Sequence, residues 1–324
     1  MVDFVVAPTI AGGARIRRQR VADVLFRAMT RAFAVGVLLL LSAVMIALLV
    51  GGLPAMRAFG FGFIFDQTWN PVRQVFGGAP AIYGTLLTSL IAMLIGVPLA
   101  LGVAIFLTEL CPPWLRRPIG ILIELLAAIP SIIYGIWGLF ILAPFLQLTV
   151  QPFLKATLGN IPLLGTLFSG PPLGLGVLTA GFILAVMVLP FIAAVTRDVF
   201  QTVPSILRES AYGIGCTTSE VIRDIVIPYT RVGIVGGVML GLGRALGETM
   251  AVTFVIGNAH RISASLLAPG TTISATLANE FTEAVGDLYT SSLIELGFIL
   301  FIITFLVLAA AKLLLLRIEL RAAK

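Results

Sequence analysis

Apolar residues dominate six long stretches of the chain, and polar residues gather in the segments between them. Each stretch is close to the ~20 residues that a helix needs to cross the hydrocarbon core of a bilayer. Backbone polar groups inside a bilayer must find partners within the protein, so stretches of this length are expected to be helical. The pattern predicts an all-α, polytopic integral membrane protein. Its six transmembrane helices are expected at residues 33–53, 84–107, 119–146, 173–196, 232–257 and 293–316.

The composition indicates that lipid is the solvent of this chain. Hydrophobic residues make up 59% of the 324 residues and charged residues 11%, against about 25% charged in a typical soluble domain. The first apolar stretch follows an arginine-rich leader that is too long for a cleavable signal peptide, so we expect a retained anchor. We expect a basic tail at 1–32, a six-helix transmembrane domain at 33–318 and a short tail at 319–324. Residues 21–33 suit either an amphipathic surface helix or a disordered segment.

Arginine and lysine are unevenly distributed between the two sides that six crossings define. Sixteen fall on the side of the termini and four on the other side, with Arg244 inside a span. Because positively charged flanks stay in the cytoplasm, both termini are expected there. The formal charge of +6 does not indicate a nucleic-acid partner, since the basic residues flank the apolar stretches and do not form one patch.

The expected cytoplasmic loop at 197–231 carries the strongest motif of the sequence. It reads ESAYGIG at 209–215 and, after nine residues, IVIP at 225–228. Apolar residues at helical spacing predict two short helices, and Gly215 can supply the tight bend between them. Such a pair offers a rigid contact to a cytoplasmic partner, although a hairpin that packs only on its own bundle would show the same spacing. The residues expected to make the contact are Glu209, Ala211, Gly215, Ile225 and Pro228.

Arg244 and Glu248 lie inside the fifth predicted span, in the run GLGRALGETM at 241–250. A rise of about 1.5 Å per residue from residue 232 puts Arg244 about 18 Å into a hydrocarbon core of about 30 Å. A charge at that depth costs at least about 2.5–3.5 kcal/mol, so it usually faces a pore or a partner. A spacing of four predicts one shared helix face.

Two interpretations of this pair remain open. One is an ion pair that only fixes packing. The other is an anion pathway, because a guanidinium stays charged and offers paired donors to phosphate-like oxygens. In that case we expect Glu248 to hold Arg244 when the pore is empty and then to accept a hydrogen bond from a protonated oxyanion.

The third predicted span contains a proline at about its middle. Pro130 has no N–H and frees the carbonyl of Leu126, which predicts a kink there. Ser131 and Tyr134 follow the proline, and their hydroxyls are candidates for a polar pathway. Kinked spans with serine are also common as packing devices. Glu124, earlier in the same span, is expected to pair with a cytoplasmic arginine.

The sequence argues against an enzyme and against a metal site. A P-loop needs Gly-Lys-Ser/Thr, and none of the three lysines follows a glycine. His260 is the sole histidine, in an outer loop without a neighbouring cysteine. We expect His260 to be a solvated loop residue, and Glu280 and Glu283 to form a solvated face or to touch another protein.

Several segments together resemble the permease subunits of the phosphate-specific ATP-binding-cassette (ABC) importer, the C-type subunit in particular. The cytoplasmic motif is similar to the EAA loop of such importers, with Ser210 and Ile227 as mild departures. The other segments that carry the resemblance are 65–71 with its WNP, AIYGTL at 81–86, IPSIIYG at 129–135, 242–250, and LANEFTEA at 277–284.

The resemblance implies a type I importer permease fold of the MetI-like kind, in the inner membrane of a bacterium. It implies a transport subunit with no cofactor and no ATPase activity of its own. The implied partners are a homologous second permease in a heterodimer, two cytoplasmic ATP-binding subunits and an extracytoplasmic phosphate-binding protein. It also implies that Arg244 and Glu248 match charged positions tied to phosphate passage.

Two alternative functions remain open. A permease for sulfate or molybdate would use the same architecture, because selection in such systems lies largely in the binding protein. A secondary transporter driven by an ion gradient could use Glu124 and Glu248 as relay groups, but it leaves the 209–228 motif unexplained.

Overall fold

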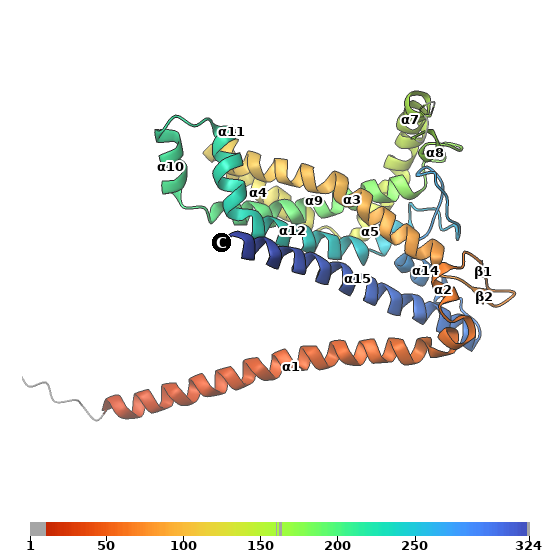
Figure 1. Ribbon diagram of the computed structural model, residues 1–324, viewed down its shortest axis with the longest axis horizontal. Helices are drawn as coiled ribbons and strands as arrows, with labels where there is room; N and C mark the ends of the chain where they lie inside the picture. The colour runs from red at the N-terminus through yellow and green to blue at the C-terminus, as the bar shows by residue number, and fades with distance from the viewer. Residues whose placement is uncertain (1–10, 160, 162–163, 323–324) are drawn as a thin grey trace, which may run out of the picture. The chain divides into compact units, whose positions relative to one another are not determined.

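The computed structural model describes residues 11–159, 161 and 164–322, and Figure 1 shows the order of its elements. Contacts divide the chain into two units, residues 1–50 and 51–324. Residues 21–33, for which a disordered segment was one expectation, belong to the long helix α1, which continues through the first predicted span. The helices and strands before the third span are α1 (Ala11–Phe59), α2 (Gly62–Phe65), β1 (Trp69–Asn70), β2 (Val75–Phe76) and α3 (Ala79–Ile105).

The rest of the chain is helical and interrupted at several points. The first group of elements is α4 (Pro113–Ala127), α5 (Ser131–Trp137), α6 (Ala143–Phe145), α7 (Gln151–Leu158), α8 (Leu164–Leu167) and α9 (Val177–Gln201). The second group is α10 (Ser205–Gly213), α11 (Thr218–Val221), α12 (Ile227–Leu246), α13 (Met250–Thr253), α14 (Ile273–Glu280) and α15 (Asp287–Ala322). Short π-helical turns extend α3 and join neighbouring pieces at Phe106–Leu110, Gly138–Leu142, Leu146–Val150 and Ile222–Val226.

Six helices in the described residues are long and apolar enough to cross a membrane, which confirms the predicted number. The third differs from its prediction at 119–146, because the helix stops at Ala127 and a new one runs from Ser131 to Leu158. The fifth begins earlier than expected, at Thr218, and ends at Leu246. Average hydropathy locates an apolar stretch but is insensitive to where its backbone hydrogen bonds break, which explains both shifts.

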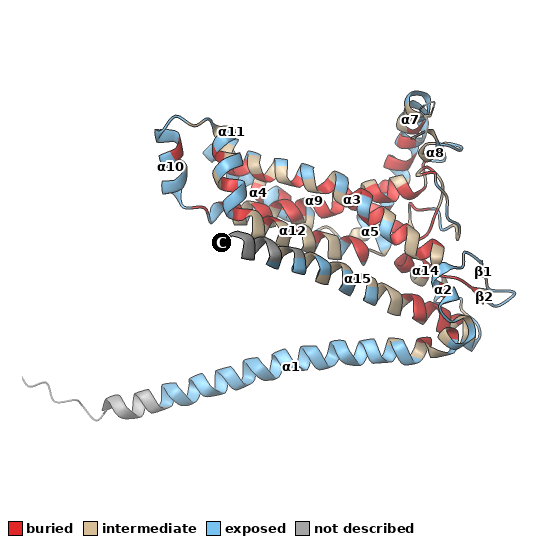
Figure 2. Cartoon of the chain, viewed as in Figure 1, coloured by how far each residue is buried: buried red, intermediate tan, exposed pale blue. Residues whose placement is uncertain are grey.

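Helix α9 is the centre of the residues 51–324, and Figure 2 shows it buried along much of its length. It packs against α3, α4 and α12, and small residues allow the close approach. A Cβ on Gly181 would lie 2.6 Å from Ile91, and one on Gly241 would lie 2.6 Å from Ile192. Lipid tails are as apolar as the helix surfaces, so the hydrophobic effect does not drive helices together in a bilayer. This close van der Waals contact therefore stabilises the bundle.

The two ends of this bundle carry different polar structures. Helices α10 and α11 lie at one end, near the start of α4, and the β1–β2 hairpin, α2 and α14 lie at the other (Figure 1). The hairpin is antiparallel, with Trp69 opposite Phe76. Gly84 of α3 packs directly on the loop before α14, since a Cβ there would lie 1.8 Å from the Thr271 carbonyl oxygen. Helix α3 therefore fixes this loop through a position that only glycine can fill.

Candidate functional site

The third span is interrupted at Pro130, and a tyrosine hydroxyl donates a hydrogen bond to a main-chain carbonyl at the interruption. Pro130 lies outside any helix, with φ −57° and ψ 136°, between the end of α4 and Ser131, the first residue of α5. The carbonyl of Leu126 accepts a hydrogen bond from the Tyr134 hydroxyl at 2.8 Å. Tyr134 itself is 8% exposed. The predicted disruption is present as a full interruption of the helix, and Tyr134 satisfies the carbonyl that the proline leaves without its usual partner.

The fifth span is broken as well, directly after Arg244. Helix α12 ends at Leu246, with Gly247 as its C-terminal cap, and the short α13 begins at Met250. The Glu248 carboxylate accepts a hydrogen bond from the Ala251 N–H at 3.2 Å, through Oε1. Glu248 thus lies in the break and caps the first turn of α13.

The expected shared helix face of Arg244 and Glu248 is wrong, because helix α12 ends between them. No hydrogen bond or ion pair joins the two side chains in the part of the chain that the structure describes. The structure therefore shows neither an Arg244–Glu248 ion pair that fixes packing nor the expected contact of Glu248 with Arg244 in an empty pore. Arg244 is exposed.

The two helix breaks lie beside each other. A Cβ added to Gly135 of α5 would lie 3.1 Å from the Cα of Ala251 and 3.2 Å from the Met250 carbonyl oxygen, both in α13. The four residues proposed from the sequence, Ser131, Tyr134, Arg244 and Glu248, thus flank one region where two spans are discontinuous. Non-helical backbone at membrane depth is tolerated only where it is buried in protein or lines a water-filled cavity.

The motif at 209–228 forms the expected pair of short helices. Helix α10 carries Glu209 and Ala211, and Gly215 follows it with φ +93°, a left-handed conformation that glycine adopts without strain. Thr217 and Glu220 form a capping box at the start of α11. Ala211 is buried, whereas Glu209 is exposed. Helix α9 reaches Gln201 and α11 begins at Thr218, both within the expected loop at 197–231.

Ile225 and Pro228 lie where the second motif segment joins the fifth span. Ile225 is in the π-helical turn at Ile222–Val226 and is half-buried, and Pro228 is at the first turn of α12 and exposed. A proline that continues a helix cannot donate the usual backbone hydrogen bond, which accounts for a π-helical turn just before it.

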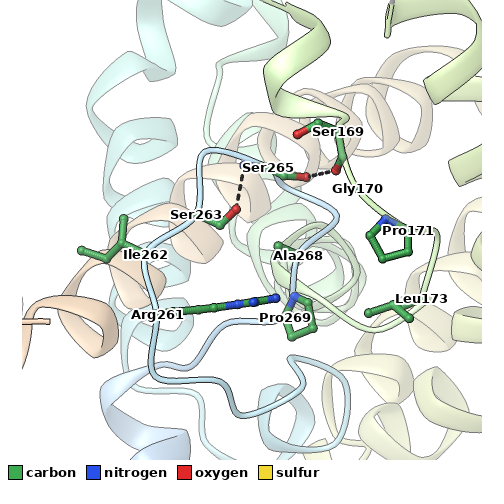
Figure 3. Close-up of a pocket in the computed structure, with 10 residues that line it drawn as sticks. All are labelled: Ser169, Gly170, Pro171, Leu173, Arg261, Ile262, Ser263, Ser265, Ala268 and Pro269. Atoms are coloured by element: carbon green, nitrogen blue, oxygen red, sulfur yellow. Dashed lines mark hydrogen bonds between the residues drawn. The ribbon is translucent and has the colours of Figure 1, made fainter. Parts of the chain in front are cut away.

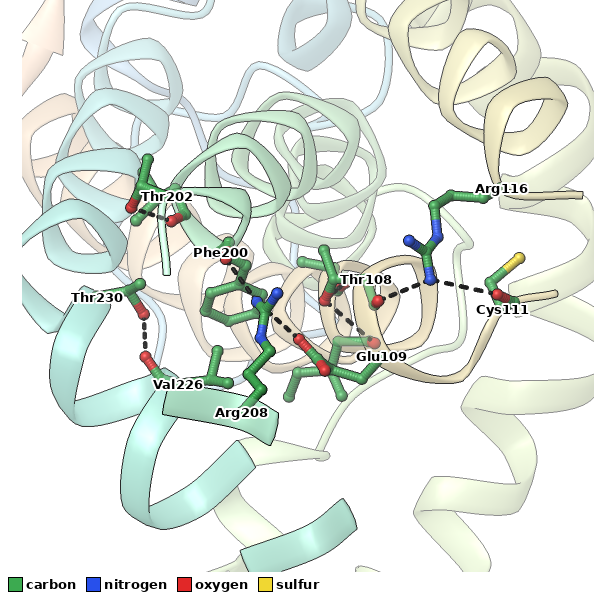
Figure 4. A network of polar contacts seen from close by, with 12 residues as sticks. Thr108, Glu109, Cys111, Arg116, Phe200, Thr202, Arg208, Val226 and Thr230 are labelled. Carbon is green, nitrogen blue, oxygen red and sulfur yellow. Dashed lines mark hydrogen bonds and ion pairs between the residues drawn. The ribbon is translucent and has the colours of Figure 1, made fainter. Parts of the chain in front are cut away.

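An ion pair that the sequence did not reveal ties α10 to the bundle. Arg208 Nη2 lies 3.1 Å from Glu109 Oε1, at the end of the helix that continues α3, although the two are not aligned as a hydrogen bond. The same Nη2 donates to the Phe200 carbonyl at 2.7 Å, near the end of α9. The Glu109 side chain is 6% exposed. Figure 4 shows Arg208 between these two partners.

The opposite end carries a second polar cluster, and there the expectation of a solvated His260 and a solvated Glu280 is wrong. Glu280 Oε1 lies 2.6 Å from His260 Nε2. Glu280 Oε2 accepts hydrogen bonds from Trp69 Nε1 and from the Tyr289 hydroxyl, both at 2.7 Å. The rings of Trp69 and His260 stack with centroids 5.1 Å apart. Glu283, in contrast, is exposed as expected.

This cluster predicts an acid-sensitive contact between the hairpin and α14. Burial raises the pKa of Glu280, but the hydrogen bonds from His260, Tyr289 and Trp69 and the charge of His260 outweigh it, so that the pKa lies below its ordinary value of 4.5. A carboxylate with a lowered folded pKa stabilises the fold above its ordinary pKa, and that contribution disappears as the pH falls through the folded value. We expect Trp69 fluorescence, in a Trp114→Phe/Trp137→Phe background, to change below pH 4.5.

Two variants test the assignment to Glu280. Glu280→Gln should remove this titration of Trp69 fluorescence, because an amide binds no proton in that range. Glu283→Gln changes a neighbouring exposed carboxylate and should leave the titration as it is. An unchanged titration in Glu280→Gln would show that another group is responsible.

A cavity of about 290 Å³ lies at the same end as this cluster, between the loop after α8 and the loop before α14. Arg261 extends across it toward Pro269 (Figure 3). The Ser265 hydroxyl donates to the Ser169 carbonyl at 2.6 Å and so joins the two loops. Among the described residues no group of three or more His, Cys, Asp or Glu side chains could hold a metal ion.

Comparison with known proteins gives consistent results. The family model described as "Binding-protein-dependent transport system inner membrane component" matches residues 94–320. A curated relative from Mesorhizobium japonicum, "Phosphate transport system permease protein PstC", is 66% identical over 95% of this chain and 94% of its own length. A relative of the same name from Pasteurella multocida is 57% identical over 92% of this chain and 93% of its own length.

Solved structures of importers share the fold at low sequence identity. A bacterial alginate ABC transporter matches with a TM-score of 0.57 and 17% identity, over 92% of this chain and 96% of that one. The MetNI methionine ABC transporter matches with a TM-score of 0.55 and 16% identity, over 78% of this chain and 99% of that one. These likenesses confirm the predicted type I importer fold. The chain belongs to the family of binding-protein-dependent transport system inner membrane components, as a multi-pass inner-membrane permease subunit of the PstC type.

Proposed function

We propose that this chain is the channel-forming subunit of an ABC importer that moves inorganic phosphate into the cytoplasm, with ATP hydrolysed by a separate subunit. Relatives that are 66% and 57% identical over nearly the whole chain are phosphate transport permeases by name. The observation that carries the proposal is Arg244, an exposed guanidinium at a helix break within an apolar span, with no carboxylate partner among the described residues.

Arg244 is proposed to meet the translocated anion. An unpaired charge in an apolar span is costly, and a passing phosphate would supply the missing counter-charge. The guanidinium offers two parallel donors to two phosphate oxygens. Glu248 uses Oε1 to cap α13, and its second oxygen can accept a hydrogen bond from a protonated phosphate oxygen. This pairing favours the monoanion or dianion of phosphate over a fully deprotonated oxyanion such as sulfate.

Ser131 and Tyr134 are proposed to line the same pathway on the α5 side. Ser131 starts α5 beside the break, and its side chain is half-buried. Tyr134 donates its proton to the Leu126 carbonyl, so in this state its oxygen is available only as an acceptor for a donor such as Arg244 or a protonated phosphate. A shift of α5 relative to α4 would free the hydroxyl for the anion.

The assembly around this chain is proposed from the family and the coupling loop. Members of the family work with a second permease, ATPase subunits and a periplasmic binding protein. For this chain we propose a heterodimer with a homologous permease, two ATP-binding subunits, one of which docks on the exposed face of α10, and a phosphate-binding protein. Both termini are proposed to be cytoplasmic, with 1–32 and 319–324 as tails of the membrane domain at 33–318.

Reconstitution of the full complex in liposomes tests this function. Uptake of radiolabelled phosphate should require the binding protein outside and ATP on the side of α10. It should persist when proton and sodium gradients are clamped at zero, and excess sulfate should not compete. Uptake that follows an imposed ion gradient without ATP would instead establish a secondary transporter, and competition by sulfate would contradict the assignment of the substrate.

A further inference from the structure

A basic cavity lies between α4 and the end of α9. Its volume is about 290 Å³, and three arginines line it: Arg116, Arg117 and Arg197. Glu124 and Gln201 line it as well. Neither the transport family nor the relatives' names assign a ligand to it.

Arg197 is fixed in the cavity by two carboxylates and one glycine. Its Nη2 lies 2.7 Å from Glu124 Oε1, which confirms the expected partner of Glu124, and 2.8 Å from Asp198 Oδ1. Its Nη1 lies over Gly120, where a Cβ would come within 2.7 Å. The Arg197 side chain is 15% exposed. Because Gly120 has no side chain, the guanidinium fits against α4, and its Nη1 makes no hydrogen bond among the described residues.

The other two arginines add donors, some of which have no partner among the described residues. Arg116 donates from Nη2 to the carbonyls of Thr108 and Cys111 at 2.9 and 3.5 Å, which fixes the guanidinium (Figure 4). Arg117 has no hydrogen bond or ion pair within the described residues, and it is exposed. Three guanidinium groups outnumber the two carboxylates Glu124 and Asp198, so the cavity has a net positive charge and unused donors, which suits a phosphoryl oxyanion.

The surface beside the cavity is apolar. Leu122 and Leu125 of α4 are each 58% exposed, and Trp114, at the start of the same helix, is 75% exposed. Tryptophan is enriched where the headgroups meet the hydrocarbon core. A basic cavity between transmembrane helices with an apolar surface beside it can hold a headgroup phosphate and the acyl chains of one molecule.

We propose that this cavity binds a phosphoryl group and that its source is the headgroup of an anionic phospholipid in the leaflet on the side of α10. The headgroup phosphate contacts Arg117, Arg116 and Nη1 of Arg197, and the acyl chains lie along Leu122 and Leu125. The same chemistry could be supplied by free phosphate, which lacks acyl chains and so gains nothing from the exposed face of α4.

Native mass spectrometry of the complete transporter tests the proposal. The complex is released from nanodiscs that contain equal amounts of phosphatidylglycerol and phosphatidylcholine, and the retained lipids are counted. Arg117→Gln should lower retention of phosphatidylglycerol about fivefold, because one basic residue near the surface is lost, and should leave phosphatidylcholine unchanged. Arg117 has no hydrogen-bond or ion-pair partner among the described residues, so this change should not disturb folding. The matched control is Arg223→Gln, which alters an exposed arginine at the same end, outside the cavity.

Inorganic phosphate distinguishes the two sources. Excess phosphate added before release should leave retention of phosphatidylglycerol unchanged if the acyl chains hold the lipid in place. Displacement of the lipid by phosphate, lost in Arg117→Gln, would overturn the lipid assignment in favour of free phosphate. Equal retention in wild type, Arg117→Gln and Arg223→Gln would overturn the site itself.

Discussion

Replacing Arg244 with glutamine is expected to lower phosphate uptake by the reconstituted transporter between about tenfold and a hundredfold, the range expected when a hydrogen bond to a charged group is lost. The amide keeps a donor but has no charge to attract the anion into an apolar span. Arg244 is exposed and makes no hydrogen bond or ion pair among the described residues, so the fold should tolerate the change. Initial rates of radiolabelled phosphate uptake measure the effect, with ATP hydrolysis recorded in the same vesicles.

Arg244→Lys and Glu248→Gln refine this experiment. Lysine keeps the charge but loses the planar pair of donors, so we expect a smaller loss than with glutamine. Glu248→Gln should weaken uptake most at low pH, where phosphate has more protons to donate to the carboxylate. The control is Arg231→Gln, which removes an arginine earlier in the same helix. If neither Arg244→Lys nor Glu248→Gln changes uptake at any pH, the pathway lies elsewhere.

Replacing Arg208 with methionine is expected to separate ATP hydrolysis from uptake and to destabilise the end of the bundle that carries α10. The change leaves the Glu109 carboxylate, which is 6% exposed, without its counter-charge, and breaking a buried pair in this way costs about 3 kcal/mol. It also removes the hydrogen bond to the Phe200 carbonyl. Limited proteolysis between α9 and α11 should become faster, and uptake per ATP hydrolysed should fall.

The double variant Glu109→Leu/Arg208→Met separates charge burial from coupling. Removal of both charges should restore part of the thermal stability, because apolar pairs of similar size often replace buried ion pairs without loss. It should not restore uptake per ATP, since α10 is still released from the end of α3. Arg223→Met, at a side chain 86% exposed, serves as a control and should change neither quantity. Full recovery of coupling in the double variant would contradict the anchoring role of Arg208.

Local signals in the sequence were enough to predict much of the fold. Six apolar stretches fixed the number of spans, and Gly215 was correctly assigned to the bend between two short helices. Pro130 predicted a kink, because a missing N–H acts on the carbonyl four residues earlier whatever the surroundings, and the structure has a full interruption of the helix there. The end of α12 between Arg244 and Glu248 was missed, since glycines within an apolar run are compatible with a continuous helix.

Contacts between distant segments could not be predicted in the same way. Trp69 and Glu280 are 211 positions apart, and no periodicity relates them, so Glu280 was expected in solvent. Glu109 and Arg208 each flank an apolar stretch, where charged residues are ordinary. Only the packing of α3 beside α9 brings their segments together. The sequence around a charged residue does not show whether that residue has a buried partner or lies in water, because the partner comes from a distant segment.

The two interrupted spans have a consequence for how variants of this transporter are interpreted. Where α4 stops before Pro130 and α12 stops at Leu246, carbonyl and amide groups of the main chain lose their helical partners. No replacement of a side chain removes these groups. Hydration at this depth is therefore expected to survive in every substituted protein, so that a change in transport reports the electrostatics of the passage and not whether water can enter it.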